Sequence, residues 1–247
     1  MNLNSKKYTE ELARLRSNSQ RPAQWYYYKW LYSKIENELP NEGTILEIGS
    51  GYGMSEDFIE SENIYRTEFM SDVPAGVHGG IDASNLIFND HSFASTFAVD
   101  AIHHIPDSLM AIKELLRVTK IGGKVILVEP YVSLLSYPIY KMFHNEKTSM
   151  KLDISKHRSW VSEAPEDGNQ GVMQNILKVI TTGKEEVVFR KMTIVYFSPL
   201  SFFATGGLSR PIPLPMAFIR AIIGFEKYIP SRILRITASR FIVIFEK

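Results

Sequence analysis

Leu46-Glu47-Ile48-Gly49-Ser50-Gly51-Tyr52-Gly53 is the stretch of this sequence that decides the fold. It ends a short β-rich run, residues 44–48, and precedes a segment, residues 54–60, that can start a helix. Glycines at such a junction let the backbone turn sharply and approach a ligand closely. Taken alone, the stretch is equally consistent with an ordinary strand-to-helix connection, so its surroundings must decide between the two interpretations.

The spacing of these glycines is G-x-G-x-G, which differs from the G-x-G-x-x-G of dinucleotide-binding turns. A dinucleotide site needs a helix N-terminus aimed at a pyrophosphate. The spacing found here therefore favours a small ligand that approaches the backbone without a pyrophosphate.

Strands and helices alternate along the chain after residue 44, which predicts a parallel sheet with right-handed crossovers. We expect a Rossmann-like α/β fold with a seven-stranded, mostly parallel sheet and helices on both faces. A helical N-terminal extension and a helical insertion after the fifth strand complete it. The expected strands are residues 44–48, 64–69, 77–81, 93–99, 124–128, 187–197 and 241–245, and the expected helices are residues 5–38, 54–60, 107–119, 133–144, 170–181 and 216–228.

A chain of 247 residues is long enough for one large α/β domain with an insertion. We expect residues 1–247 to form a single domain in four parts. These parts are an N-terminal helical segment (1–43), a ligand-binding core (44–130), an insertion that acts as a lid over the substrate (131–184), and C-terminal strands that complete the sheet (185–247).

The composition excludes several classes of protein. A formal net charge of +1 argues against a nucleic-acid-binding surface, and the absence of cysteine excludes disulfides and thiolate zinc sites. No leader peptide precedes the polar N-terminal stretch, and no apolar run reaches the ~18 residues of a transmembrane helix. We therefore expect a cytoplasmic protein without a transmembrane segment.

Acidic residues follow the next two predicted strands. Glu68 lies at the end of the second strand, close to the ~20-residue spacing at which dinucleotide folds place a ribose-binding acid, and Asp72 is a competing candidate. Asp82 follows the third strand. Ligands of open α/β sheets bind at the carboxyl ends of strands, so acids at successive strand ends favour a shared site over solvated surface positions.

Four segments resemble, in order, the motifs of class I S-adenosylmethionine-dependent methyltransferases. The resemblance covers about residues 44–130 and is specific for the fold and the cofactor rather than for the substrate. Two departures are the absence of the usual LPF in residues 84–88 and Ala94 in place of an aspartate. The segments are residues 46–53 (LEIGSGYG), 82–93 (DASNLIFNDHSF, against DA-x-x-LPF-x-D-x-SFD), 102–107 (IHHIPD, against LHHIPD) and 116–125 (LRVTKIGGKV, against RVLKPGGR).

The resemblance implies a role for each matching residue. Glu47 and the turn formed by Gly49, Ser50, Gly51 and Gly53 would hold the methionine part of S-adenosylmethionine. Glu68 would bind the ribose, Asp82 and Ala83 the adenine, and Asp100 would lie near the sulfonium. A weaker resemblance, in residues 129–133 and 143–146, is to a subset found in bacterial surface-polysaccharide or secondary-metabolite gene clusters.

Methyl transfer requires alignment of the acceptor with the methyl group and, for a hydroxyl acceptor, removal of a proton. The candidate bases are His103 and His104, after the fourth strand, and His144, in the insertion. Each histidine could instead pack or be solvated. Glu129, at the end of the fifth strand, could orient a hydroxyl. We expect no metal, because neighbouring histidines point apart and no ligand pattern of known spacing is present.

The sequence thus predicts methyl transfer to an oxygen of a small molecule or a sugar acceptor. One alternative is a methyltransferase that acts on protein or nucleic acid, and another is a non-catalytic cofactor-binding scaffold. Residues 216–225 carry an apolar stripe next to Arg220 and Lys227. Core packing is the favoured interpretation of that stripe, and contact with a membrane surface or a lipid-linked substrate is the alternative.

Overall fold

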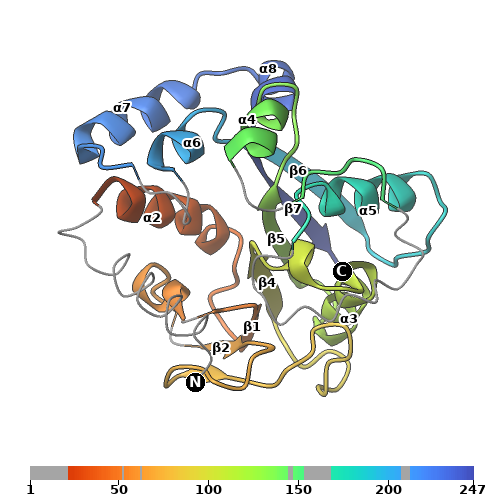
Figure 1. Cartoon of the computed structure of the whole chain (residues 1–247). Helices are drawn as coiled ribbons and strands as arrows, with labels where there is room; N and C mark the ends of the chain where they lie inside the picture. The colour runs from red at the N-terminus through yellow and green to blue at the C-terminus, as the bar shows by residue number, and fades with distance from the viewer. Residues whose placement is uncertain (1–21, 52, 62, 144–146, 153–167, 207–211) are drawn as a thin grey trace.

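A computed structural model of the chain describes residues 22–51, 53–61, 63–143, 147–152, 168–206 and 212–247. One seven-stranded sheet runs through the molecule in the order β3-β2-β1-β4-β5-β7-β6 (Figure 1). All pairs from β3 to β5 are parallel, whereas β7 is antiparallel to both of its neighbours. The predicted Rossmann-like sheet is confirmed. The strands are β1 (Ile45–Ile48), β2 (Ile64–Thr67), β3 (Val77–His78), β4 (Ser95–Val99), β5 (Lys124–Pro130), β6 (Lys191–Phe197) and β7 (Arg240–Glu246).

The central strands are buried because helices cover both faces of the sheet. Strand β5 reads Lys-Val-Ile-Leu-Val-Glu-Pro, and its residues 125–128 are fully buried. Such a continuous apolar run is typical of a strand that is covered on both sides. One face packs against α2 (Pro22–Glu36), α6 (Ser201–Thr205) and α7 (Met216–Glu226), and the other packs against α3 (Ser108–Val118) and α5 (Val172–Thr181).

The remaining short elements are η1 (Met54–Asp57), η2 (Ile102–His104), α4 (Ser136–Phe143) and α8 (Ser231–Thr237). Helices α6 and α8 were not expected from the sequence. Asp107 is the N-cap of α3, because its carboxylate accepts a hydrogen bond from the backbone N–H of Met110 (3.0 Å). Pro22 occupies the first position of α2, where a missing N–H costs nothing.

The helix expected at residues 54–60 is instead the single 3₁₀ turn η1. It begins after Gly53, whose φ of 73° is left-handed, and it ends at Phe58. Met54, Phe58 and Ile59 nevertheless pack into the core, so the segment buries its apolar side chains without forming a full helix. Residues 1–21 and 153–167, parts of the expected N-terminal helix and insertion, lie outside the described residues, as does His144.

Candidate functional site

The glycine turn between β1 and η1 has the conformation that the sequence required. Gly49, Gly51 and Gly53 all have positive φ, at 66°, 54° and 73°. A Cβ added to Gly49 would lie 2.4 Å from the Cβ of Ala101, so the turn passes directly against the segment after β4. A side chain is thus excluded at Gly49 by both backbone conformation and space.

Glu68, just past β2, is held beside this turn. Its carboxylate accepts a hydrogen bond from the N–H of Gly51 (2.9 Å) through one oxygen and from the N–H of Phe69 (2.8 Å) through the other. A carboxylate oxygen has more than one lone pair, so both oxygens retain acceptor capacity. Because Glu68 is partly exposed, it can offer this capacity to the two hydroxyls of a ribose.

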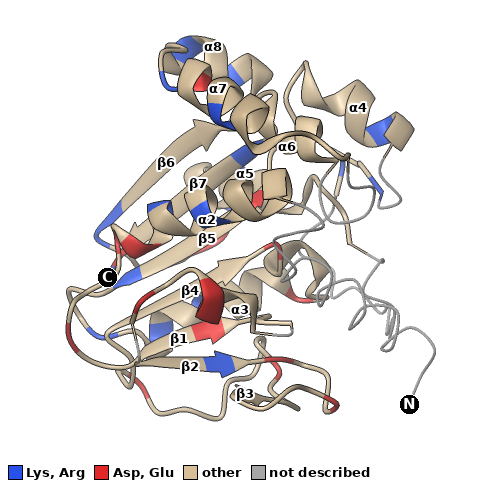
Figure 2. Ribbon diagram, turned by 90° about the vertical axis from the view of Figure 1, so that its left-hand side faces the viewer, with Lys and Arg blue, Asp and Glu red and all other residues tan. Residues whose placement is uncertain are grey.

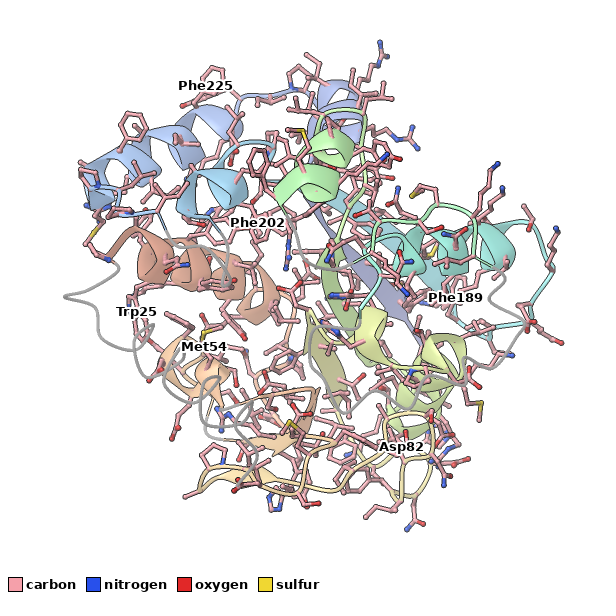
Figure 3. All side chains as sticks on the ribbon, in the orientation of Figure 1. Trp25, Met54, Asp82, Phe189, Phe202 and Phe225 are labelled. Atoms are coloured by element: carbon pink, nitrogen blue, oxygen red, sulfur yellow. The ribbon has the colours of Figure 1, made fainter. Side chains whose placement is uncertain are left out.

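Asp82 lies on an exposed loop after β3, at the opposite end of the molecule from Phe225 (Figure 3). One oxygen of its carboxylate accepts hydrogen bonds from the N–H (2.8 Å) and the hydroxyl (2.7 Å) of Ser84. The second oxygen has no such bond in the described structure, and it can accept from an amino group. Ala83, next in the chain, is buried against the second core cluster.

Arg117, which the sequence analysis did not single out, fixes the loop that carries Asp82. Its guanidinium donates to the carbonyl oxygens of Leu86 (2.9 Å) and Phe88 (2.8 Å). It also forms a two-pronged pair with Glu114, and Glu114 accepts from the N–H of Leu86 (2.9 Å). The planar fork of arginine suits this geometry. Arg117 is the arginine of the fourth motif, which was the available signal in the sequence.

Glu47 lies beneath the glycine turn and is only 2% exposed. Its carboxylate accepts from the hydroxyl of Ser55 (2.5 Å), and Arg66 lies 3.8 Å away. Burial raises the pKa of Glu47 to about 7, although the hydroxyls of Ser55 and Ser50 and the charge of Arg66 act in the opposite direction. Glu47 therefore contacts other side chains of the protein, and these contacts support the glycine turn on its buried side.

Asp100 follows β4 and has a left-handed φ of 53°. The sequence placed it near the sulfonium, but it did not indicate the partner that the structure provides. Arg240, the first residue of β7, is 2% exposed and brings its Nη2 to 2.5 Å from Asp100 Oδ1. The side chain of Asp100 is 22% exposed, so the carboxylate faces outward and the guanidinium lies behind it.

Aromatic side chains surround this ion pair. We call Tyr27, Asp100, Tyr140, Phe202 and Arg240 the Arg240 cluster. The guanidinium lies 4.9 Å from the ring centre of Phe202, and both tyrosines are fully buried. Burial raises the pKa of each tyrosine, so both hydroxyls stay neutral. They bond to Ser198 and to the carbonyl of Ser239.

Arg240 retains hydrogen-bonding capacity within the cluster. Its Nη2 is engaged by the carboxylate of Asp100, whereas its Nε makes no hydrogen bond with the described residues. A buried guanidinium with an unused donor is costly unless a ligand completes its bonding. Arg240 was not expected from the sequence, since the predicted last strand began at residue 241.

His103 and His104 lie together in η2, with their ring centres 4.1 Å apart. His103 is 2% exposed, and its Nδ1 is 2.6 Å from Glu129 Oε2. The other oxygen of Glu129 accepts from the N–H groups of Ala101 (3.2 Å) and Ile102 (2.8 Å). Glu129 is fully buried, and its carboxylate holds both the loop and His103. His104 is the partly exposed histidine.

The turn, Glu68 and Asp82 follow β1, β2 and β3, and Asp100 and the histidines follow β4. Parallel strands bring all of them to one edge of the sheet. Among the side chains that the structure describes, no group of three His, Asp or Glu is placed to hold a metal ion. Within the same residues, no helix is both long and apolar enough to cross a bilayer.

Comparison with known proteins agrees with this geometry. Residues 46–127 match the family model described as a methyltransferase domain. This match confirms the resemblance carried by the four sequence motifs.

The chain is also similar to two curated proteins named demethylmenaquinone methyltransferase. The protein from Staphylococcus haemolyticus is 34% identical over 95 residues, which cover 38% of this chain and 37% of that protein. The protein from Staphylococcus epidermidis is 39% identical over 69 residues, which cover 28% of this chain and 27% of that protein. The similarity thus extends over only about a third of each relative.

Among solved structures, a SAM-dependent methyltransferase from Archaeoglobus fulgidus is similar over 90% of this chain and 94% of its own, with a TM-score of 0.53 and 13% identity. This likeness extends beyond the family match and shows a shared fold.

Proposed function

We propose that this chain, whose residues 46–127 form a class I S-adenosylmethionine-dependent methyltransferase domain, transfers a methyl group to an oxygen of a small-molecule acceptor. S-adenosylmethionine supplies the methyl group on a positively charged sulfur. The residues of the chain bind it, align the acceptor with it and exclude water.

The arrangement of Glu68 beside the glycine turn is the observation that carries this proposal. The N–H groups of Gly51 and Phe69 fix the carboxylate where the ribose hydroxyls of an adenosyl group can donate to it. Strand β1 is followed only by the 3₁₀ turn η1, so no long helix aims its N-terminus at a pyrophosphate. The residues therefore fit an adenosyl ligand without phosphates, with Asp82 and Ala83 on the adenine side.

The Arg240 cluster supports an acceptor with an oxygen that gains negative charge. A guanidinium whose Nε is an unused donor stabilises such an oxygen, and the buried rings of Tyr27, Tyr140 and Phe202 favour a largely apolar or aromatic molecule around it. The curated relatives are named for methylating demethylmenaquinone, which supports a small-molecule acceptor. We place the acceptor next to Asp100, with α2 and the 131–184 insertion as its cover.

His104 is our candidate for the general base. Glu129 fixes the neighbouring His103, and the two imidazole rings are in contact. In this proposal the buried Glu129–His103 pair is a positioning device, and the partly exposed His104 removes the acceptor proton. His144 stays a candidate whose position lies outside the described residues.

A methyl-transfer assay tests the proposal directly. The protein is incubated with S-adenosylmethionine and a panel of phenols, quinols and sugars, and the release of S-adenosylhomocysteine is measured. We expect turnover with at least one acceptor. If S-adenosylhomocysteine is released at the same rate with and without each acceptor of the panel, at saturating cofactor, the proposal is contradicted.

The variant Arg240→Lys tests the acceptor side with the same assay. Lysine keeps the charge but loses the planar fork, so the KM for the acceptor should rise by about tenfold or more while the Kd for the cofactor is unchanged. Arg190→Lys is the matched control, because Arg190 pairs with Glu246 on the surface. An unchanged KM in Arg240→Lys would remove the cluster from the acceptor site.

A further inference from the structure

The outer face of α7 is apolar where a surface helix is normally polar. Ile219 and Ile223 are buried against the core, as expected for an amphipathic helix. On the opposite side, however, Phe218 and Phe225 are 57% and 62% exposed, and Tyr228, just past the helix, is 86% exposed. Figure 3 shows Phe225 on the outer side of α7. This face lacks a partner among the described residues.

Helices α4 and α8 extend the same surface. All three helices lie at one end of the molecule (Figure 1): α8 follows α7 in the chain after a short connection, and the N–H of Leu135, just before α4, donates to the carbonyl of Ile236 in α8 (3.3 Å). No residue of α8 is buried, although it contains three large aliphatic side chains. The exposed apolar residues of these two helices and their flanks are Leu134, Tyr137, Met142, Phe143, Ile233 and Ile236.

The charges on this surface are of one sign. Residues 131–143 and 212–238 contain the basic residues Lys141, Arg220, Lys227, Arg232 and Arg235, all exposed. Arg220 and Lys227 lie at the border with α2, where Arg220 stacks on Tyr26 (4.9 Å to the ring centre), rather than among the exposed rings of α7. Glu226 is the one acidic residue in the two ranges, and it is 5% exposed. Its carboxylate accepts hydrogen bonds from the backbone N–H groups of residues 200 and 201, both at 2.7 Å, and so satisfies the N-terminal end of α6. Figure 2 shows the basic residues of α7 and α8 at this end.

We infer that α4, α7 and α8 form a docking face for an anionic phospholipid bilayer. Exposed aromatic and aliphatic side chains next to lysines and arginines are the features of a helix that lies in the interface of a membrane. The basic residues would meet the lipid phosphates, while the rings would enter the headgroup region. The core interpretation favoured from the sequence for the stripe of residues 216–225 is correct for Ile219 and Ile223, whereas Phe218 and Phe225 are exposed and belong to the docking face.

The charge distribution selects the bilayer over a second copy of the chain. Two identical faces in contact would oppose five basic residues with five others, and no exposed acid in these two ranges would compensate them. An anionic lipid surface attracts the same set, by a factor of about five for each basic residue near it. Soluble proteins rarely expose contiguous groups of large apolar side chains, and those that do generally use them for binding.

The docking face lies directly behind the Arg240 cluster. On α4, Tyr140 is buried in the cluster, whereas Tyr137 and Phe143, each about one turn away from it, are exposed, and Arg240 follows α8 closely in the chain. If the proposed function holds, a docked protein would receive an acceptor dissolved in the bilayer. The docking itself does not depend on methyl transfer.

Sedimentation with lipid vesicles tests the inference on the full chain without turnover. Vesicles of phosphatidylcholine alone are compared with vesicles that also contain phosphatidylglycerol. We expect co-sedimentation with the anionic vesicles only, and a loss of binding at high salt. Absence of binding, or equal binding to both kinds of vesicle, would overturn the inference.

Two double variants locate the binding surface. Phe218→Ser with Phe225→Ser removes rings, and Lys227→Glu with Arg232→Glu reverses charges; each should lower the partition coefficient by about tenfold or more. The controls are Ile121→Ser, which replaces an equally exposed apolar residue elsewhere, and Lys178→Glu with Lys184→Glu. Controls that reduce binding as much as the test variants would contradict the assignment.

Two further measurements keep the outcomes distinct. Calorimetric binding of S-adenosylhomocysteine should be unchanged in both double variants, so failure of docking leaves the proposed function intact. Sedimentation velocity of the wild type without lipid reports self-association. Suppose that the wild type does not bind vesicles but forms a dimer, and that the Phe218→Ser, Phe225→Ser variant is a monomer. The inference would then be wrong, and the occupant of the face would be a second copy of the chain.

Discussion

Glu47 is the ionisable residue on which the shape of the glycine turn depends most directly. Its carboxylate lies where water cannot solvate the charge, which raises its pKa from 4.5 to about 7. The hydroxyl of Ser55 and the guanidinium of Arg66 offset only part of that effect. The protonation of Glu47 is therefore linked to folding near neutral pH.

We predict that this linkage lowers the stability of the protein as the pH rises. Between the unfolded pKa of 4.5 and the folded pKa of about 7, the unfolded chain loses the proton while the folded chain keeps it. The free energy of unfolding should therefore fall over this window, by up to about 3 kcal/mol from this group. Glu47→Gln, which has no such proton to lose, should remove that part of the pH dependence.

Urea unfolding at about pH 5 and about pH 8 measures the effect. The matched control is Glu60→Gln, at an exposed position after η1, and it should keep the slope of the wild type. If Glu47→Gln also shows the wild-type slope, Glu47 is ionised in the folded state and the account of its burial is wrong.

Single residues also show how far the sequence could predict the site. Gly49, Glu68 and Asp82 follow from strand-end positions, because a parallel sheet brings those ends together whatever the details of packing. The partnership of Asp100 with Arg240 could not be predicted in this way. It joins distant parts of the chain across antiparallel β7, and neither spacing nor periodicity reports such a contact.

At the scale of elements, Arg117 links α3 to the loop on the adenine side. Its bonds to the carbonyls of Leu86 and Phe88 set the position of a segment that has little regular structure of its own. The helix is firmly packed and the loop is exposed, so the position of Asp82 depends on this link. Arg117 is thus a positioning residue for the cofactor site.

We predict that Arg117→Lys weakens the binding of S-adenosylmethionine by roughly tenfold, because lysine cannot replace the forked bonds, each of which contributes about 0.5–1.5 kcal/mol. Fluorescence or calorimetric titration measures the Kd, and amide hydrogen exchange of residues 82–91 should accelerate. Lys113→Arg, on the same helix, is the control, since Lys113 pairs instead with Glu185. Wild-type affinity together with wild-type exchange in Arg117→Lys would refute the role.

The elements themselves were predicted where the pattern of buried residues was strong. The continuous apolar run of β5 and the apolar stripe of α3 correctly indicated a strand and a helix. Segment 54–60, where Met54, Phe58 and Ile59 are apolar at helical spacing, was predicted as a helix; these side chains are indeed buried, but the backbone forms only a single 3₁₀ turn. Helix α8 was missed because none of its residues is buried, so core packing leaves no signature in its sequence.

At the scale of the whole molecule, the sheet separates two surfaces with different chemistry. The edge at the ends of β1 to β4 presents the glycine turn, Glu68 and Asp82, which suit an adenosyl ligand. The end formed by α4, α7 and α8 is apolar and basic. The Arg240 cluster lies between them, so one domain can hold a water-soluble methyl donor and an apolar acceptor at the same time.

Calorimetric titration of S-adenosylmethionine into the wild type, Glu68→Ala and Asp72→Ala tests the central claim most directly. We predict saturable binding at one site in the wild type and a loss of roughly 10- to 100-fold in Glu68→Ala, because a carboxylate that accepts ribose hydroxyls contributes about 1.5–3 kcal/mol. Asp72, exposed in the loop after β2, should be replaceable without effect. Absence of binding to the wild type, or equal affinity in the wild type and Glu68→Ala, would contradict the account.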